Sequence, residues 1–435
     1  MEDIVQIKYA LDTFYFLICG ALVMWMAAGF AMLEAGLVRA KNTTEILTKN
    51  VALFAIACTM YLLVGYHIMY SSPEGGIFPS FGVLIGAENT VEDVLAGGDD
   101  APYYSVASDF FFQVVFAATA VTIASGAMAE RTKFSAYLIF SAVMTGFTYP
   151  VVVHSFWHGD GLLSDLNIGD ARFSDFAGSS IVHSAGGWAA LMGAVFLGPR
   201  LGKYGPDGRP RAIPGHNIGF VVIGVFILWF GWFGFNAGSE LAFDAWVAHA
   251  IMTTLLAASA GTLVAGAVIW KKTGAMDVGL AGNGALAGLV SITAGTGTMN
   301  FLGAVIVGAI GGALVVYSVL FIERRGVDDP VGAVSVHGVC GVWGTLAIGL
   351  FARHDDAFLG RDNAGLFYGG GFDQLLVQAI GVLLIAAWVL GTSAILFKVL
   401  KSTVGLRVSA EEELAGLDVA EHGSPGYGPE PVLVG

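Results

Sequence analysis

Eleven apolar runs, nearly all as long as a membrane-spanning helix, alternate with polar stretches along the chain. A helix needs about 20 residues to cross the hydrocarbon core of a bilayer. Charged residues make up only 12% of the sequence, mean hydropathy is +0.73, and the 61 glycines suit closely packed membrane helices. We therefore predict an all-α polytopic membrane protein with transmembrane helices near residues 13–37, 47–70, 104–129, 134–156, 179–198, 215–237, 243–270, 278–293, 299–322, 331–352 and 373–400.

The basic residues predict the orientation of this bundle. Sixteen of the 20 Lys and Arg lie in or beside the loops that follow odd-numbered segments. Loops rich in Lys and Arg stay in the cytoplasm. We therefore expect the N-terminus outside and the C-terminus inside. The four basic residues expected on the outer side are Lys8, Arg172, Arg353 and Arg361.

The loop at residues 71–103 is acidic and contains no Lys or Arg. One interpretation is an ordinary solvated loop. The other is an outer surface that modestly enriches cations, an effect that salt screens. Its acidic residues are Glu74, Glu88, Glu92, Asp93, Asp99 and Asp100.

Several classes of protein are disfavoured. A net charge of −14 and the lack of a basic patch argue against a nucleic-acid partner. Cys19, Cys58 and Cys340 all fall in apolar runs, which argues against disulfides and thiolate metal sites. His154 and His158, with Asp160 nearby, have spacing that a metal site accepts, but amphipathic residues also gather at membrane interfaces. We expect no metal and no cofactor.

The pattern Asp-x2-Gly-x4-His-x3-Gly occurs twice, 154 residues apart, at the start of the fifth and tenth apolar segments. Because five is odd, the second copy enters the membrane from the opposite side. We predict two inverted five-helix repeats, segments 1–5 and 6–10, followed by an eleventh helix. The two copies are Asp175, Gly178, His183 and Gly187, and Asp329, Gly332, His337 and Gly341.

The two histidines are expected to meet. Each follows its aspartate by eight residues, which is about 12 Å along a helix. Entering a core about 30 Å thick from opposite faces, both arrive near its midplane. A single histidine in an apolar helix is more often a packing residue, but a matched pair at one repeat position favours a shared functional site. The two histidines of this pair are His183 and His337.

Several stretches resemble the ammonium transporter family, whose relatives include the Rhesus proteins. The resemblance covers roughly residues 10 to 430 and depends on the combination of motifs. These are Asp175-Phe-Ala-Gly-Ser-Ser-Ile-Val-His183 through Gly198-Pro-Arg200, Phe112-Gln-Val-Val-Phe116-Ala, Gly126-Ala-Met-Ala-Glu-Arg131, Gly231-Trp-Phe-Gly-Phe235-Asn-Ala-Gly-Ser239, Val336-His337-Gly-Val-Cys-Gly341, Gly405-Leu-Arg-Val and Gly416-Leu-Asp with Glu421-His-Gly.

The resemblance implies a role for each matching residue. Phe116 and Phe235 would form a stacked gate below an outer vestibule, where Phe112, Trp157 and Ser239 recruit ammonium. Aromatic faces attract a cation by about 0.5–2 kcal/mol, and a hydroxyl can accept one of its hydrogen bonds. Without the motifs, ordinary helix packing would explain these phenylalanines. The implied supporting residues are Asp175, Trp232 and Asp329.

Energetics decides which species crosses the membrane. Burying an unpaired cation in hydrocarbon costs far more than one or two aromatic contacts return. The chain is therefore expected to recruit ammonium and to conduct neutral ammonia below the gate. The resemblance implies that ammonium is deprotonated near the gate and that ammonia passes His183 and His337. A neutral imidazole offers one donor and one acceptor, so the pair can also pass a proton, which makes net proton transfer the working hypothesis.

Asp175 is expected to accept backbone N–H bonds near Ser179 at the start of the fifth helix, and Asp329 is its counterpart before the tenth. The chain departs from many relatives at Met32-Leu-Glu34-Ala-Gly. This places a carboxylate near the inner end of the first helix, with Arg39 as a candidate partner.

The expected organisation is a transmembrane domain at residues 1–400 and a cytoplasmic tail at 401–435. The resemblance implies a homotrimer with one pore per subunit and a PII-type regulatory protein that acts at the tail. The alternative for the tail is a disordered acidic segment. With no targeting segment recognised, the prokaryotic inner (plasma) membrane is the expected location.

Three other functions remain open. A Rhesus-type gas channel would conduct without current, but the matches at Trp157 and Ser239 favour the ammonium branch. A sensor would use the same fold, although no signalling domain is recognised. An enzyme is disfavoured because no nucleophile–base pair, metal cage or nucleotide-binding loop is found.

Overall fold

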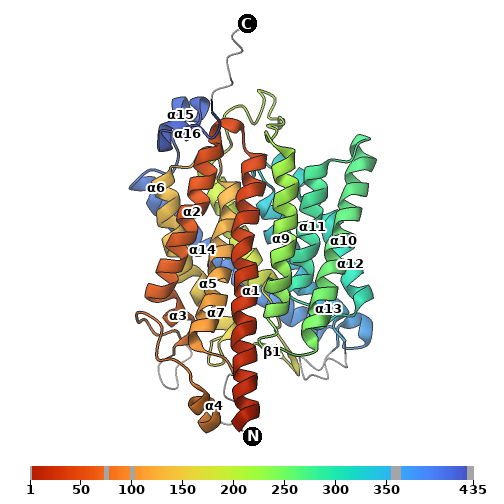
Figure 1. Cartoon of the computed structure of the whole chain (residues 1–435). Helices are drawn as coiled ribbons and strands as arrows, with labels where there is room; N and C mark the ends of the chain where they lie inside the picture. Colours follow the sequence, from red (N-terminus) through yellow and green to blue (C-terminus); the bar gives the residue numbers. More distant parts are fainter. Residues whose placement is uncertain (1, 73–77, 98–102, 354–363, 429–435) are drawn as a thin grey trace.

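A computed structural model describes residues 2–72, 78–97, 103–353 and 364–428. Long helices run side by side through most of the molecule (Figure 1). Strands β1 (Asn167–Ile168) and β2 (Ala171–Arg172) form a small antiparallel hairpin. Glu74, Asp99 and Asp100 of the acidic loop and Arg361 of the orientation argument lie outside the described residues.

The first half of the bundle contains several interrupted helices. Its elements are α1 (Glu2–Leu37), a 3-10 turn η1 (Ala40–Asn42), α2 (Thr43–Met60), η2 (Tyr61–Gly65), α3 (Tyr66–Tyr70), α4 (Val91–Gly97), α5 (Val106–Ala127), α6 (Phe134–Val143), η4 (Met144–Thr148), α7 (Tyr149–Trp157), η5 (Ser179–Ser184) and α8 (Ala185–Leu197). The turns η2, η4 and η5 are π-helical.

The elements of the second half are α9 (Ile218–Gly238), α10 (Trp246–Thr273), α11 (Val278–Thr293), α12 (Phe301–Arg324), the π-helical turn η6 (Val334–Val339), α13 (Cys340–Phe351), a 3-10 turn η7 (Leu366–Tyr368), α14 (Asp373–Ser402), α15 (Ala410–Ala415) and α16 (Leu417–His422). Of these, α9 to α12 and α14 are continuous helices, and a π-helical turn precedes α13.

The all-helical membrane architecture is confirmed at this level. Within the described residues, ten helical stretches are long and apolar enough to cross a membrane. A shorter apolar helix, Val278–Thr293, occupies the position of the eighth expected segment. Length and composition therefore support a multi-pass membrane protein and leave the count of eleven as a prediction.

Helix α1 begins at Glu2, well before the predicted boundary at residue 13. Its first turns are held by contacts outside the apolar core. The Tyr9 hydroxyl donates to the Asn89 carbonyl at 2.6 Å, and the Lys8 ammonium lies 3.7 Å from the Tyr103 ring centroid. A helix continues into water where such contacts support it. The hydropathy of the sequence therefore predicted only the apolar part of α1.

Glycines let the helices near the centre approach backbone to backbone. A Cβ on Gly187 of α8 would lie 2.2 Å from the Gly338 nitrogen of η6. A Cβ on Gly224 of α9 would lie 2.5 Å from the Leu33 nitrogen of α1. Neither position has room for a side chain, so these glycines set how closely the elements of the two halves pack.

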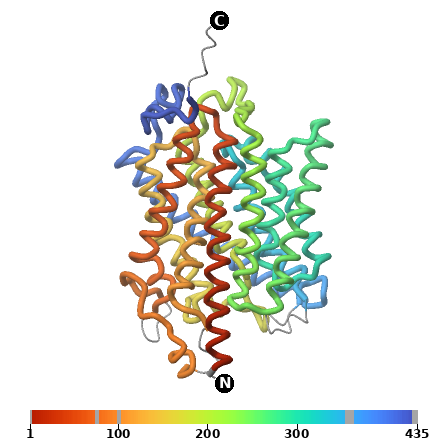
Figure 2. Tube along the Cα trace, viewed as in Figure 1, coloured from red at the N-terminus to blue at the C-terminus, as the bar shows by residue number. Residues whose placement is uncertain are grey.

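The two ends of the bundle are here called the N-terminal face, where the chain begins, and the tail face, where α15 and α16 lie (Figure 2). On the tail face Arg407 Nη2 donates to Glu413 Oε2 at 2.7 Å, and Asp418 Oδ1 accepts the backbone N–H of Glu45 at 3.0 Å. The part of the tail from Arg407 to Asp418 is therefore ordered, and Asp418 connects it to α2.

Candidate functional site

A cavity of about 430 Å³ opens near the N-terminal face. It has room for a small cation with several water molecules, since water occupies about 30 Å³ per molecule in the liquid. Its lining brings together the predicted residues Phe112, Phe116, Trp157, Ser239 and Asp175. We call it the aromatic cavity.

Two stacked phenylalanines form one wall of this cavity. The ring centroids of Phe116 and Phe235 are 4.0 Å apart, with an angle of 24° between the planes. Phe112 packs on Phe116 with a centroid separation of 4.7 Å. Phe116 lines the cavity, whereas Phe235 stacks on His183 with a centroid separation of 5.1 Å. The stacked rings therefore lie between the aromatic cavity and the histidine.

Polar groups of the cavity have fixed directions. Ser239 Oγ donates its proton to the Phe235 carbonyl at 2.9 Å, so its lone pairs remain available to a donor. Trp157 Nε1 donates to the Asp175 carbonyl at 2.9 Å, which holds the indole ring at the edge of the cavity. Trp157 thus presents a positioned aromatic ring, and Ser239 presents a positioned acceptor oxygen.

Sequence reasoning missed a buried acid on this wall. Asp109 lines the cavity together with Gln113 and Tyr104. Its carboxylate accepts a hydrogen bond from the Tyr66 hydroxyl at 2.8 Å and has no ion-pair partner among the described residues. A carboxylate in such a place favours cations. The available signal was the spacing of Asp109 and Gln113, four residues apart on the helix that carries Phe112 and Phe116.

The two predicted histidines meet at the centre of the bundle. His183 Nδ1 and His337 Nδ1 are 3.3 Å apart, which requires one nitrogen to donate and the other to accept. The two rings have centroids 5.3 Å apart with 27° between their planes. His183 is fully buried, and its Nε2 has no hydrogen-bond partner among the described residues.

Trp232 also packs against His183. The two ring systems stack at 4.7 Å with 20° between their planes. The indole Nε1 donates to Thr293 Oγ1 at 2.9 Å, so the tryptophan itself is anchored. This contact agrees with a supporting position for Trp232.

The repeated aspartates form similar turns before the two histidines. Asp175 accepts four backbone N–H bonds, from residues 178 to 181, at 2.8–3.0 Å. Asp329 accepts two, from Gly332 at 3.0 Å and Val334 at 2.8 Å. In both turns the glycine has positive φ, +102° at Gly178 and +80° at Gly332, a conformation that favours glycine. Burial raises the pKa of Asp175, and its four backbone donors oppose that rise.

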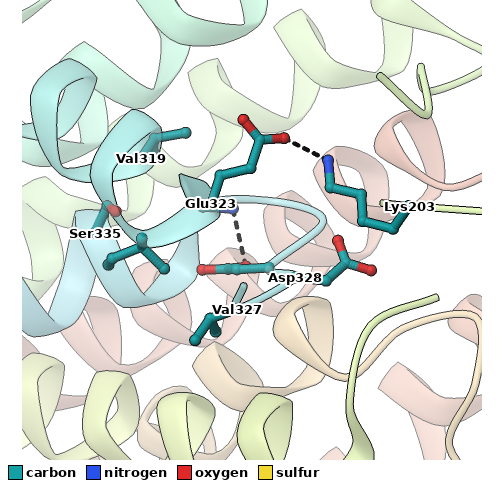
Figure 3. A pocket seen from close by; sticks show the side chains of 9 residues that line it. Lys203, Val319, Glu323, Val327, Asp328 and Ser335 are labelled. Carbon is teal, nitrogen blue, oxygen red and sulfur yellow. Dashed lines mark hydrogen bonds and ion pairs between the residues drawn. The ribbon is translucent and has the colours of Figure 1, made fainter. Parts of the chain in front are cut away.

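Two small cavities lie beyond the histidines. The first, of about 10 Å³, is lined by Phe30, Glu34, Asn283, Val331 and His337 among others. The second, of about 30 Å³, is shown in Figure 3, where the Lys203–Glu323 ion pair and Asp328 border it. Each is far smaller than the aromatic cavity, so the open space on this side of the histidines is narrow.

An ionic cluster near the tail face corrects one prediction. Arg39 pairs with Glu130 at 3.1 Å, and Glu34 instead accepts hydrogen bonds from other residues. Glu130 also pairs with Arg200 at 2.8 Å, and Arg200 pairs with Asp328 at 2.9 Å.

Burial alone would raise the pKa of Glu130, but Arg200 and Arg39 outweigh it and hold that pKa at about 2. Arg200 likewise holds the pKa of Asp328 at about 2 against its burial.

The structure also describes the other candidate metal residues. His154 and His158 stack with centroids 4.7 Å apart, and a ring nitrogen of each lies 3.1 Å from a backbone carbonyl oxygen. Within the described ranges, no group of three His, Cys, Asp or Glu side chains is arranged to hold a metal ion. Cys19, Cys58 and Cys340 are free thiols.

Comparisons with known proteins give a consistent result. The sequence pattern of the Ammonium Transporter Family matches residues 14–427. The chain is 46% identical to ammonium transporter Amt2 of Archaeoglobus fulgidus, covering 96% of this chain and 88% of that protein. It is 40% identical to a putative ammonium transporter of Synechocystis, covering 98% and 92%.

Solved structures agree with this assignment. A sensor Amt protein superposes with a TM-score of 0.84 at 35% identity, covering 97% of this chain and 100% of that one. Mep2 of Candida albicans superposes with a TM-score of 0.79 at 26% identity, covering 93% and 87%. The family consists of transporters, which agrees with the expectation that the chain is not an enzyme. With its motifs, its fold and its relatives in agreement, the chain belongs to the ammonium transporter family.

Proposed function

We propose that this protein transports ammonium: the aromatic cavity recruits the cation, the cation loses its proton near Phe116 and Phe235, and ammonia passes His183 and His337 with net proton transfer. The observation that carries the proposal is the buried His183 Nε2, which lacks a protein partner just beyond the stacked phenylalanines. A buried polar nitrogen without a partner is costly unless a polar ligand satisfies it.

The chemistry of the cavity supports recruitment of a small cation. The faces of Phe112 and Trp157 attract positive charge, and Ser239 offers a hydroxyl oxygen as acceptor. The Asp109 carboxylate adds a negative charge at the same wall. Ammonium is a small cation with four N–H donors, so it matches both the aromatic faces and the oxygen acceptors.

The step past the phenylalanines favours neutral ammonia. The rings of Phe116 and Phe235 leave no polar partner for a dehydrated cation. Desolvating an unpaired ion costs several kcal/mol or more, whereas a cation–π contact returns about 0.5–2 kcal/mol. Ammonium therefore gives up its proton at this point, and ammonia continues.

The histidine pair provides a route for the released proton. Because the two Nδ1 atoms share one hydrogen bond, a proton that arrives on one ring can leave from the other. Two positive charges on the pair are opposed by burial and by mutual repulsion. One proton at a time thus accompanies each ammonia, and transport carries net positive charge.

The proposal includes the membrane arrangement. The aromatic cavity faces outward and the tail face inward, in the inner (plasma) membrane. Eleven helices form two inverted five-helix repeats and a final helix, with residues 1–400 as the transmembrane domain and 401–435 as the cytoplasmic tail. The similar turns around Asp175 and Asp329 support the repeat. Family membership supports a homotrimer and a PII-type regulatory partner at the tail.

The test is the transient current across proteoliposomes after a jump in ammonium concentration. The intact protein should give a current that potassium does not elicit and that His337→Ala strongly reduces. His249→Ala serves as a matched control, because His249 Nε2 contacts the Met299 carbonyl at 2.9 Å and does not line the cavities described above. A rise in internal pH without current would instead identify a channel for neutral ammonia.

A sensor is the second candidate, favoured by the 35% identity with the sensor Amt protein. A sensor of this kind would bind ammonium in the aromatic cavity without moving it. Ammonium binding to the purified protein, together with the absence of both current and pH change in proteoliposomes, would favour this candidate over transport.

A further inference from the structure

Glu34 is a fully buried carboxylate that the transport scheme above does not use. It lies on α1, and its side chain is 1% exposed. Asn50 Nδ2 donates to Glu34 Oε2 at 2.7 Å, and Ser125 Oγ donates to the same oxygen at 2.8 Å. Both hydrogen bonds fall on one oxygen, and Oε1 accepts none among the described residues.

Glu34 borders the same small cavity as His337. This cavity of about 10 Å³ lies beyond the histidine pair as seen from the aromatic cavity. A volume of about 10–15 Å³ is enough for one molecule the size of water, and ammonia is of similar size. The cavity thus places one carboxylate and one imidazole around a space that fits a single ammonia.

Within the part of the chain that the structure describes, Glu34 has no direct ion pair. Lys49 on α2 lies 3.6 Å from Glu45 Oε1 and donates to the Ser125 carbonyl at 3.3 Å. The other titratable groups facing this region are Tyr137 of α6 and His337 of η6. Helix α5 contributes Ser125 and α11 contributes Asn283, which are neutral, and α9 contains no titratable residue.

A buried carboxylate in this position readily exchanges protons. Taking an unpaired carboxylate out of water is costly, so the group gains from holding a proton. Two hydrogen bonds from neutral donors stabilise the ionised form as well. Glu34 can therefore exist in both states, which a group that passes protons requires.

We propose that Glu34 returns the proton to ammonia on the inner side of the histidine pair. The proposal rests on the transport function argued above. In this step the O–H bond of protonated Glu34 breaks, the proton joins the lone pair of ammonia, and ammonium and a carboxylate result. His337 then passes the next proton to the carboxylate. One proton and one ammonia enter and one ammonium leaves, so atoms and charge balance.

Three variants in proteoliposomes test this role, with the ammonium-driven current as readout. Glu34→Gln keeps the shape and polarity of the side chain but cannot carry the proton, and its current should fall by at least about tenfold. Glu34→Asp keeps a carboxyl group and should retain a measurable part of the current. Asp12→Asn is the matched control, because Asp12 is also a buried acid on α1 but caps the Phe243 N–H at 2.9 Å, away from the small cavity.

The outcomes are distinguishable. A Glu34→Gln current within about twofold of the Asp12→Asn current would overturn the proposal, because the loss expected for a general acid is much larger. Equal losses in Glu34→Gln and Glu34→Asp would also overturn it, since they would indicate a packing role. Should Glu34→Gln fail to fold, a folded Glu34→Asp with no measurable current overturns it alone, because the carboxyl group that passes the proton is still present. If the intact protein gives no current, the proposed electrogenic transport itself fails.

Discussion

His183 and His337 face each other through their Nδ1 atoms at 3.3 Å, although 154 residues separate them in the chain. Each follows its aspartate by eight residues, and each aspartate holds a turn through backbone N–H groups. The position of the pair therefore depends on two carboxylates that do not touch it, and the two turns can be tested separately.

The first prediction concerns these two turns. Asp175→Ala removes an acceptor for four N–H groups, and Asp329→Ala removes an acceptor for two. Loss of an N-terminal cap costs about 0.5–2 kcal/mol, and hydrogen bonds to a charged group raise that cost. Thermal melting of the purified protein should show the larger decrease for Asp175→Ala. Equal decreases would show that the number of backbone bonds does not set the stability of these turns.

The second prediction concerns selectivity. Phe235→Ala removes one of the two stacked rings and opens space between the aromatic cavity and His183. Hydrated potassium should then enter, and the ratio of ammonium to potassium current should fall. Phe397→Ala is the control, because Phe397 stacks on Phe140 at 5.0 Å and is fully buried elsewhere. Both changes should cost about 3–5 kcal/mol of stability, so a loss of selectivity in both would contradict a gate at Phe235.

The third prediction concerns acid. The pKa values of Glu130 and Asp328 are held at about 2, below their ordinary values of 4.5 and 3.8. A carboxylate whose pKa is lowered by folding stabilises the protein above its ordinary pKa, and this contribution disappears as pH falls toward the lowered value. The melting temperature should therefore fall as pH is lowered from about 4.5 toward 2.

Matched variants separate this cluster from general acid effects. Glu130→Gln should be less stable than the intact protein at neutral pH but should lose less on acidification, since one of the two titrating groups is gone. Asp165→Asn should behave like the intact protein, because Asp165 and its partner Arg172 are largely exposed. Identical pH profiles for all three proteins would contradict the role of the cluster.

The fourth prediction concerns the tail. The Glu413 carboxylate is 2% exposed, and it accepts hydrogen bonds from Arg407 and from the Leu201 N–H at 2.6 Å. Glu413→Gln weakens both contacts, so the tail should detach more often and trypsin should cut at Arg407 several times faster. Glu411→Gln, at a neighbouring exposed position, should leave the cleavage rate unchanged. Equal rates for the two variants would show that Glu413 does not hold the tail.

The sequence predicted those features that depend on the thickness of the membrane. The lengths of the apolar runs predicted where the helices lie. The eighth expected segment, for example, agrees with α11 at Val278–Thr293. The meeting of His183 and His337 followed from equal spacing behind Asp175 and Asp329. Both inferences work because depth in a bilayer is set by the number of residues along a helix.

Features that depend on side-chain direction were harder to predict. Arg39 was a candidate partner for Glu34, but α1 ends at Leu37 and the backbone of Arg39 beyond it is extended, so helical spacing does not apply to this pair. Arg39 instead meets Glu130, a residue 91 positions away. Asp109 was missed for the same reason, because only the folded packing shows that it faces the aromatic cavity.

Both histidines lie in π-helical turns, Ser179–Ser184 and Val334–Val339. Such a turn holds an extra residue, so the helix that follows is rotated by about 100° relative to a continuous α-helix. Deleting one residue from either turn would preserve hydropathy and composition but would swing an imidazole away from its partner. The number of residues between each aspartate and its histidine therefore constrains this region more strongly than the identity of the intervening side chains.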